Sequence, residues 1–335
     1  MKVIIDTLGG DKSASEFVSG AIKALDLIDG LELVFAGRKL EIEEALGELV
    51  NDKRISLLDC SEEITNDDQP TTAIRQKKDS SLVKSLELLA SDSGVDAMIS
   101  SGNTGAVLFG GMTKIGRIEG IDRAALAPIL PTLNGDGRVC LIDSGANVDC
   151  KPEMLGQFAI MGSSYMKSTM KIENPRVALI SVGTEDKKGN EQTKAAFEIL
   201  KNMPINFVGN MEARDALSGK YDVLVCDGFI GNVLLKSIEG AAVGIMKLLG
   251  KTLNENLPLN TDPTFIKKSF GQMMALLDFN SNGGATLLGI NKIVIKVHGA
   301  ATSSAVTSAI FQVKDLVDGR LVETTKDLIQ KSLEV

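Results

Sequence analysis

Short apolar runs alternate with amphipathic stretches along the whole chain, and this alternation restricts the fold more than any other feature of the sequence. Runs such as Val3–Asp6, Val95–Ile99 and Val177–Val182 are too short for helices and have the apolar character of strands buried on both faces. Between them, apolar residues recur at helical spacing. The pattern is typical of a largely parallel sheet covered by helices, so we expect an α/β fold.

The stretch Leu141–Glu153 combines a strand end, a turn and the start of a helix. Gly145 allows the turn, and Pro152 suits the first turn of a helix. Between the strand and the helix lie two acids, an amide, a thiol and a lysine. Ligands of open α/β sheets bind beyond the carboxyl ends of the strands, so the stretch is a candidate site. A helix cap is the alternative explanation, although a cap needs only one short polar residue.

Two further strand ends resemble this one, because each places glycine and asparagine directly after an apolar run. They are Ser100–Gly105 and Asp227–Asn232. Backbone N–H groups in such turns, together with asparagine amides and a nearby lysine, can bind an oxyanion or a phosphate. A nucleotide site is not indicated, because the sequence has no Gly-x4-Gly-Lys-Ser/Thr signature and no Gly-x-Gly-x-x-Gly after a strand.

Covalent catalysis and metal binding have less support. Cys150 lies beside Lys151, which leaves open a reactive thiolate or a half-buried structural thiol. His298, the only histidine, follows a strand and has the pKa range for proton transfer. Several acids near strand ends could hold Mg²⁺, but they alternate with lysines and amides, so we expect salt-bridged scaffolding, no metal site and no cofactor. These acids are Asp143, Asp149, Glu153, Glu185, Asp186, Glu191 and Asp227.

The charge and the cysteines restrict the class of protein. A net charge of −8 over 335 residues argues against nucleic acid as the main partner, since nucleic-acid-binding domains carry a basic face. We expect a cytoplasmic protein, because no signal-peptide core precedes the first strand and no apolar run approaches the length of a membrane span. The four widely spaced cysteines are expected to be reduced.

The sequence changes character between residues 240 and 280, where two apolar helical stripes occur among lysines. Such a methionine-rich pair of helices can bind a partner, line an acyl pocket or lie on a membrane, and a dimer interface or ordinary core is equally compatible. We therefore expect a helical protrusion with one of these contacts. The stripes consist of Ile245, Met246, Leu248, Leu249 and Leu253, followed by Phe265, Ile266, Phe270, Met273, Met274, Leu276 and Leu277.

A series of motifs, taken together and in this order, resembles the bacterial phosphate acyltransferase family, the acyl-[acyl-carrier-protein]:phosphate enzymes of phospholipid synthesis. The resemblance runs from end to end of the chain. Its motifs include Asp6-x-x-Gly9-Gly10-Asp11, Lys77-Lys78-Asp79-Ser80-Ser81, Ser101-Gly102-Asn103-Thr104-Gly105-Ala106, Gly145-Ala146-Asn147-Val148-Asp149-Cys150-Lys151-Pro152-Glu153, Lys188-Gly189-Asn190-Glu191, Cys226-Asp227-Gly228-Phe229-x-Gly231-Asn232 and Leu287-Leu288-Gly289.

The resemblance implies reversible transfer of a long-chain acyl group from acyl carrier protein to inorganic phosphate, which gives acyl phosphate for phospholipid synthesis. It implies a single domain over residues 1–335, a three-layer α/β/α sandwich of the isocitrate and isopropylmalate dehydrogenase type, a homodimer and loose peripheral attachment to the membrane. A membrane acyltransferase that passes the acyl group from acyl phosphate to glycerol 3-phosphate is a further candidate partner.

For this chemistry we assign the candidate site residues to three groups. Phosphate would be held by Lys188, by Lys151 and by the turn of Gly102, Asn103, Thr104 and Gly105. Asn147, Asn190 and Asn232 would donate to phosphate or to the tetrahedral oxyanion. Asp227 and Glu153 would orient these donors, and His298 would donate a proton.

Three alternatives remain at this point. A phosphotransacetylase-like enzyme would use coenzyme A thioesters, an isocitrate-type decarboxylating dehydrogenase would need a carboxylate-metal cluster, and a catalytically silent scaffold would only tether lipid-synthesis enzymes. Acyl carrier protein is acidic and should bind a basic patch. The candidates for this patch are Arg75, Lys77 and Lys78, then Arg117 and Arg123, then Lys267 and Lys268.

Overall fold

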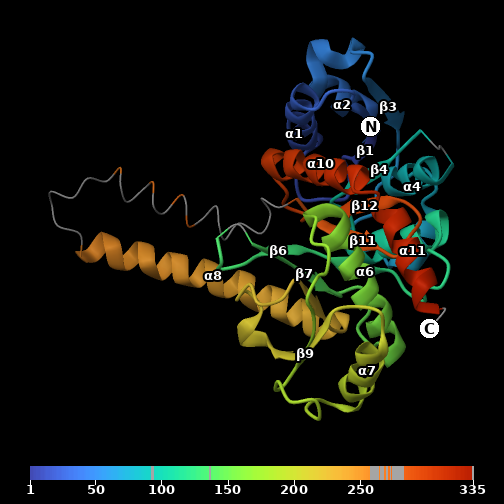
Figure 1. Cartoon of the computed structure of the whole chain (residues 1–335). Coiled ribbons are helices and arrows are strands. Elements are labelled where there is room, and N and C mark those ends of the chain that lie inside the picture. The colour runs from blue at the N-terminus through green and yellow to red at the C-terminus, as the bar shows by residue number, and fades with distance from the viewer. Residues whose placement is uncertain are drawn as a thin grey trace.

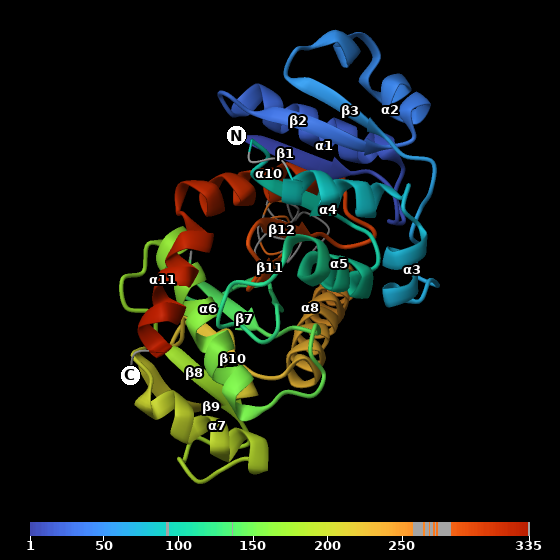
Figure 2. The same cartoon turned by 90° about the vertical axis from the view of Figure 1, so that its right-hand side faces the viewer.

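The computed structural model describes residues 1–91, 94–135, 137–256 and 283–333, together with residues 264, 268, 271 and 273. The described chain forms two sheets whose strands are mostly parallel and are flanked by helices (Figures 1 and 2). The predicted α/β fold is therefore confirmed. The structure adds that the strands are divided between two sheets.

The first sheet has seven strands in the order β3-β2-β1-β4-β12-β11-β5. Its first five strands are parallel, and the β12–β11 and β11–β5 pairs are antiparallel. The strands are β1 (Lys2–Asp6), β2 (Glu32–Gly37), β3 (Ile55–Asp59), β4 (Ala97–Ser100), β5 (Ala125–Ala127), β11 (Ala285–Leu288) and β12 (Ile293–Lys296).

The second sheet has five strands in the order β6-β7-β10-β8-β9. Only the β6–β7 pair within it is antiparallel. Its strands are β6 (Ile129–Pro131), β7 (Arg138–Ile142), β8 (Val177–Ser181), β9 (Phe207–Glu212) and β10 (Val223–Val225).

The chain crosses from the first sheet to the second at Pro128, between β5 and β6. Proline has no N–H group, so it cannot continue a ladder of hydrogen bonds. Two hydrogen bonds hold the crossing against the end of β7: Leu141 N–H donates to the Pro128 carbonyl at 3.1 Å, and Ser144 N–H donates to the Leu126 carbonyl at 3.0 Å. The two sheets therefore meet where the sequence predicted a polar strand end.

Alternate residues of the parallel strands enter different apolar cores, as expected for strands covered on both faces. Ile5 packs in one cluster with Phe17 of α1, whereas Ile4 packs in another with Leu86 of α4. The first cluster also contains Phe158 of α6, beside the second sheet, so one core spans both sheets. The helices are α1 (Ala14–Leu27), α2 (Lys39–Leu46), α3 (Pro70–Gln76), α4 (Ser81–Ser91), α5 (Thr104–Gly110), α6 (Pro152–Met170), α7 (Glu191–Asn202), α8 (Gly228–Asn256), α10 (Ser303–Asp318) and α11 (Leu321–Leu333).

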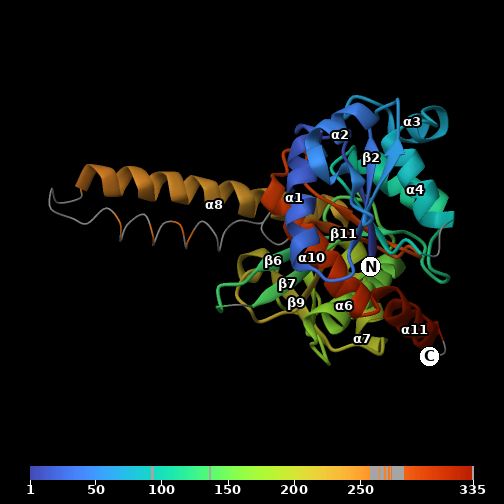
Figure 3. The same cartoon turned by 90° about the horizontal axis from the view of Figure 1, so that it is seen from above.

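Helix α8 projects away from the two sheets (Figures 1 and 3). It begins at Gly228, because the Asp227 carboxylate accepts the Ile230 N–H group at 2.8 Å and caps the first turn. The polar stretch that follows β10 is therefore a helical turn. The protruding helix starts earlier than the predicted segment 240–280, and most of the second predicted stripe, from Phe265 to Leu277, lies outside the described residues.

The outer part of α8 exposes large apolar side chains, with Val243 53%, Ile245 60% and Leu248 66% exposed. By length and composition alone, residues Gly228–Leu253 could cross a membrane, with a mean hydropathy of 1.4 and 17% of the window buried. The expectation that no apolar run approaches a membrane span is corrected here. The segment Gly228–Leu253 contains charged residues such as Lys236, but its mean hydropathy is still in the range of membrane-spanning helices.

Gly231 allows the first turn of α8 to contact the loop after β7 directly. A Cβ atom at this position would lie 1.8 Å from the Asp143 carbonyl oxygen. We predict that Gly231→Ala lowers the free energy of unfolding by about 1–3 kcal/mol or more, because backbone atoms on both sides would have to move. Urea denaturation measures this change.

Gly240→Ala is the matched control on the same helix, since a Cβ there would have no described atom within 4 Å apart from its chain neighbours and the backbone of its own helix. This control should raise the free energy of unfolding by roughly 0.5–1 kcal/mol through helix propensity. Equal effects of the two substitutions would show that the contact of Gly231 with Asp143 does not determine the position of α8.

Candidate active site at the ends of the strands

A cavity of about 430 Å³ lies where the ends of β4, β7 and β12 meet the first turns of α8. We call it the polar cavity. Its lining comes from both sheets, so it occupies the place where open α/β folds bind ligands. The polar residues of its wall are Thr104, Ser144, Asn232, Lys236, Glu239, Lys296 and His298, and its apolar residues include Leu126, Ile129, Leu130, Val148, Phe229 and Leu235.

Three of the predicted site residues line the polar cavity: Thr104, Asn232 and His298. The side chains of Thr104 and Asn232 are exposed, and within the described chain no residue bonds to the Asn232 amide. His298 Nδ1 accepts the Ala300 N–H group at 3.1 Å. The neutral imidazole therefore carries its proton on Nε2, which can donate to a ligand.

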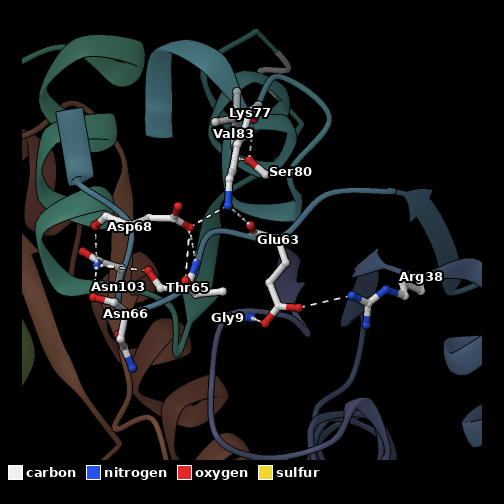
Figure 4. A network of polar contacts seen from close by, with 10 residues as sticks. All are labelled: Gly9, Arg38, Glu63, Thr65, Asn66, Asp68, Lys77, Ser80, Val83 and Asn103. Carbon is white, nitrogen blue, oxygen red and sulfur yellow. Dashed lines mark hydrogen bonds and ion pairs between the residues drawn. The ribbon is translucent and has the colours of Figure 1, made fainter. Parts of the chain in front are cut away.

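Asn103 and Gly102 lie beside Thr104, but their polar groups bond within the protein. Asn103 Oδ1 accepts the Ala106 N–H group at 3.0 Å and caps α5, and Gly102 N–H donates to Ser100 Oγ at 3.1 Å. Asn103 Nδ2 points to the carbonyl oxygens of the loop 65–68 at 3.3–3.5 Å (Figure 4). Gly105 packs against Pro70 so closely that a Cβ atom added to this glycine would lie 2.7 Å from Pro70 Cγ. These residues shape the turn that presents Thr104.

The loop 65–68 is itself fixed by a network of charged groups (Figure 4). Lys77 Nζ donates to the Glu63 carbonyl oxygen at 2.8 Å and to the Asp68 carboxylate at 2.6 Å. Glu63 in turn accepts from Gly9 N–H at 3.3 Å and from the Arg38 guanidinium at 3.2 Å. The network connects the turn after β1 to the turn after β4.

Asp143 organises the loop after β7. Its carboxylate accepts five hydrogen bonds, from the N–H groups of Leu126, Gly145, Ala146 and Asn147 at 2.6–3.2 Å and from Asn147 Nδ2 at 2.9 Å. Burial raises the pKa of this carboxyl above its ordinary value, and the hydrogen bonds from Ala146, Asn147 and Leu126 oppose that rise.

Asn147 connects this loop to α8. Its Nδ2 donates to the Ala124 carbonyl at 2.8 Å as well as to Asp143, and its own carbonyl accepts the Gly228 N–H group at 2.7 Å. The Asn147 amide thus bonds within the protein and is not presented to a ligand. Asn147 does not line the polar cavity.

We call residues 228–237 the α8 root. A second cavity of about 430 Å³ lies on the other side of this root and is lined in part by Asn190 and Asp227. Both residues are helix caps: Asn190 Oδ1 accepts the Thr193 N–H group, and Asp227 Oδ1 accepts the Ile230 N–H group, each at 2.8 Å. The walls are mainly apolar and include Leu155, Ile180, Val182, Ile230, Val233 and Leu234. The structure therefore separates Asn190 and Asp227 from Asn232 and His298.

Lys151, Lys188 and Glu153 have exposed side chains, and they line neither of these cavities. Lys188 lies in the loop after β8, where its N–H group donates to the Glu185 carbonyl at 3.0 Å. Lys151 precedes α6, whose first residue is Pro152. Their predicted contact with phosphate stays a prediction.

Two lysines of the polar cavity were not predicted. Lys236 lies on α8 and pairs with Glu239 at 2.7 Å. Lys296 is the last residue of β12, and burial lowers its pKa to about 8. A charged residue at the end of the otherwise apolar run Ile293–Lys296 was the sequence signal that could have identified it.

Cys150 is a neutral thiol. Burial and the nearby carboxylates of Asp143 and Asp227 raise the pKa of Cys150 to about 12, and Sγ donates to the Asn147 carbonyl at 3.4 Å. This environment opposes the formation of a nucleophilic thiolate and favours the structural role. Within the described residues, no three His, Cys, Asp or Glu side chains come together as a set of metal ligands.

Comparison with known proteins places the chain among lipid-synthesis enzymes. The family model described as fatty acid synthesis protein matches residues 1–323. Phosphate acyltransferase of Halothermothrix orenii is 44% identical over 100% of both chains. Phosphate acyltransferase of Bacillus pumilus is also 44% identical, over 99% of this chain and 98% of its own.

Solved structures resemble the chain in fold. A phosphotransacetylase from Streptococcus pyogenes has a TM-score of 0.60 at 16% identity, with 96% of this chain and 94% of that chain covered. A branched-chain phosphotransacylase from Enterococcus faecalis has a TM-score of 0.58 at 12% identity, with 97% and 99% covered. A putative 4-hydroxythreonine-4-phosphate dehydrogenase from Salmonella typhimurium has a TM-score of 0.51 at 15% identity, with 94% and 99% covered. The fold is thus shared by acyl-transferring and dehydrogenase proteins.

The five hydrogen bonds of Asp143 generate a stability prediction. In Asp143→Asn, an amide NH₂ replaces the oxygen that accepts both Asn147 donors, so the part-buried Asn147 N–H group loses its acceptor and Asn147 Nδ2 keeps only the Ala124 carbonyl. We expect the free energy of unfolding to fall by about 2–4 kcal/mol. Asp149→Asn, an exposed acid of the same loop, should change it by less than about 0.5 kcal/mol. Equal urea midpoints for the two variants would contradict the role of Asp143.

Proposed function

The chain belongs to the fatty acid synthesis protein family and is a phosphate acyltransferase, and from this we propose that it transfers a long-chain acyl group from the thioester of acyl carrier protein to inorganic phosphate. The product is acyl phosphate for phospholipid synthesis. The observation that carries the proposal is the polar cavity, where Lys236, Lys296, His298 and Asn232 converge beside apolar side chains. A phosphate and the carbonyl end of an acyl chain need these two kinds of surface side by side.

The reaction requires no nucleophile from the protein. An oxygen of hydrogen phosphate forms a bond to the thioester carbonyl carbon, and the carbonyl π electrons move to the carbonyl oxygen. When the tetrahedral intermediate collapses, the C–S bond breaks and the sulfur leaves with the bonding electrons. The proton of the phosphate hydroxyl ends on that sulfur, which gives acyl phosphate and the free thiol. This scheme agrees with the neutral state of Cys150.

The protein must then hold phosphate against the thioester and stabilise the oxyanion. Asn232 is suited to the second task, because its amide is exposed on the cavity wall and has no partner in the described chain. His298 offers an Nε2–H donor from the opposite sheet. A preorganised donor of this kind contributes roughly 3–4 kcal/mol to the stabilisation of the transition state.

The partners follow from the same proposal. We propose a cytoplasmic homodimer that attaches loosely to the membrane, where the exposed apolar residues of α8 supply the contact and a membrane acyltransferase receives acyl phosphate. Acyl carrier protein would bind a basic patch. Of the predicted patches, Arg75 and Lys78 are exposed whereas Lys77 is paired with Asp68, and Lys267 lies outside the described residues.

A coenzyme A thioester is the second candidate for the acyl donor, because the phosphotransacetylase and phosphotransacylase structures share this fold. The donor test is acyl phosphate formation from palmitoyl-acyl carrier protein and phosphate, beside palmitoyl-coenzyme A. We expect kcat/KM to be higher for the carrier-protein thioester. Turnover with the coenzyme A thioester alone would favour the second candidate, and no turnover with either would favour a scaffold.

Asn232→Ala should remove one oxyanion donor without disturbing the fold, since the side chain is exposed. We expect kcat to fall on the order of 100-fold or more while the urea midpoint stays near that of the wild type. Asn202→Ala, which removes an exposed amide at the end of α7, is the control and should leave kcat unchanged. An Asn232→Ala enzyme with the wild-type rate would contradict the assignment.

A further inference from the structure

The ammonium group of Lys296 is fixed at the wall of the polar cavity. Its Nζ donates to the carbonyl oxygens of Ser101 at 3.1 Å and of Val297 at 2.6 Å. An ammonium group has three N–H donors. Within the part of the chain that the structure describes, no residue accepts the third, so a ligand in the cavity can.

The charged groups around Lys296 come from several elements. Asp6 at the end of β1 and Asp11 in the following loop attract the ammonium group, and Lys236 of α8 repels it. Ser100 Oγ donates to the Asp6 carboxylate at 2.7 Å and helps to hold it beneath the turn after β4. Burial has the largest influence and lowers the pKa of Lys296 to about 8, so the lysine is mainly charged at neutral pH.

The lining of the polar cavity favours an anion. Lys236, Lys296 and His298 belong to it, and Glu239 is the only acid of its described lining. Because Glu239 is paired with Lys236, it leaves the charge of Lys296 uncompensated on the cavity side.

We infer that inorganic phosphate binds on Nζ of Lys296, between His298 at the end of β12 and Asn232 on α8. The identity of this anion rests on the proposed function. Lys151 and Lys188, the lysines that the sequence suggested for phosphate, are exposed and outside this cavity. The apolar part of the lining, with Leu130, Phe229 and Leu235, then lies beside the phosphate for the first carbons of the acyl chain.

The inference is tested by titrating inorganic phosphate into the full-length protein by calorimetry, without an acyl donor. Lys296→Met keeps the length of the side chain and removes its charge. We expect its dissociation constant for phosphate to rise on the order of 10- to 100-fold, as for the loss of one charge-assisted hydrogen bond. Lys326→Ala removes an exposed lysine of α11 and should bind phosphate as the wild type does.

The pH dependence gives a test that needs no variant. Only the protonated lysine donates to and attracts the anion, so the affinity should fall about tenfold per pH unit above the pKa of about 8. Sulfate, which does not titrate in this range, should show the same fall. Lys296→Arg keeps its charge throughout, so its affinity should not fall above pH 8.

The outcomes separate this inference from the proposed function. Unchanged phosphate affinity in a folded Lys296→Met, or a wild-type affinity that is independent of pH above 8, would overturn the inference. So would a loss of phosphate binding in Lys188→Ala with none in Lys296→Met. If phosphate binds through Lys296 but neither thioester yields acyl phosphate, the anion site stands and the proposed function fails.

Discussion

The Asp143 carboxylate is buried, and among the described residues its charge is compensated by five N–H donors rather than by a cation. Without such donors, burying the carboxylate would destabilise the fold by several kcal/mol. The N–H groups of the surrounding loops are therefore directed at this one side chain. One donor, Leu126, belongs to β5 of the first sheet, whereas Asp143 follows β7 of the second. Asn147 extends the same arrangement to the first residue of α8. Asp143 thus connects the two sheets and, through Asn147, the start of the protruding helix.

The apolar runs allowed the strands and the polar strand ends to be predicted from the sequence, because burial on both faces leaves a clear pattern. The roles of Asn103 and Asn147 could not be predicted in this way. Buried N–H and carbonyl groups of turns need partners, and a short amide side chain close by supplies them. For Asn103 the partners lie 35 to 38 residues earlier in the chain. No local pattern distinguishes an asparagine that binds its own protein from Asn232, which faces a cavity.

The division into two sheets and the importance of Lys296 escaped prediction for a related reason. A single proline between two short strands does not reveal that the strands belong to different sheets. A lysine at the end of an apolar strand becomes a cavity group only when the turn after β4 provides a carbonyl for it. Both properties arise from tertiary contacts, whereas the fold class follows from local patterns alone.

The first turns of α8 have two faces, and each face lines a different cavity. Phe229, Asn232 and Lys236 face the polar cavity, and Ile230, Val233 and Ser237 face the mainly apolar one. Gly228 and Gly231 lie against the backbone of Asn147 and Asp143, where a side chain would not fit. The position of this helix along its axis is therefore set by direct backbone contact. No described side chain lies between the two segments that could change its rotamer if the helix moved. On its other side the helix packs Leu234 into the apolar core of the second sheet, so Asn232 is positioned by backbone contact and by core packing together.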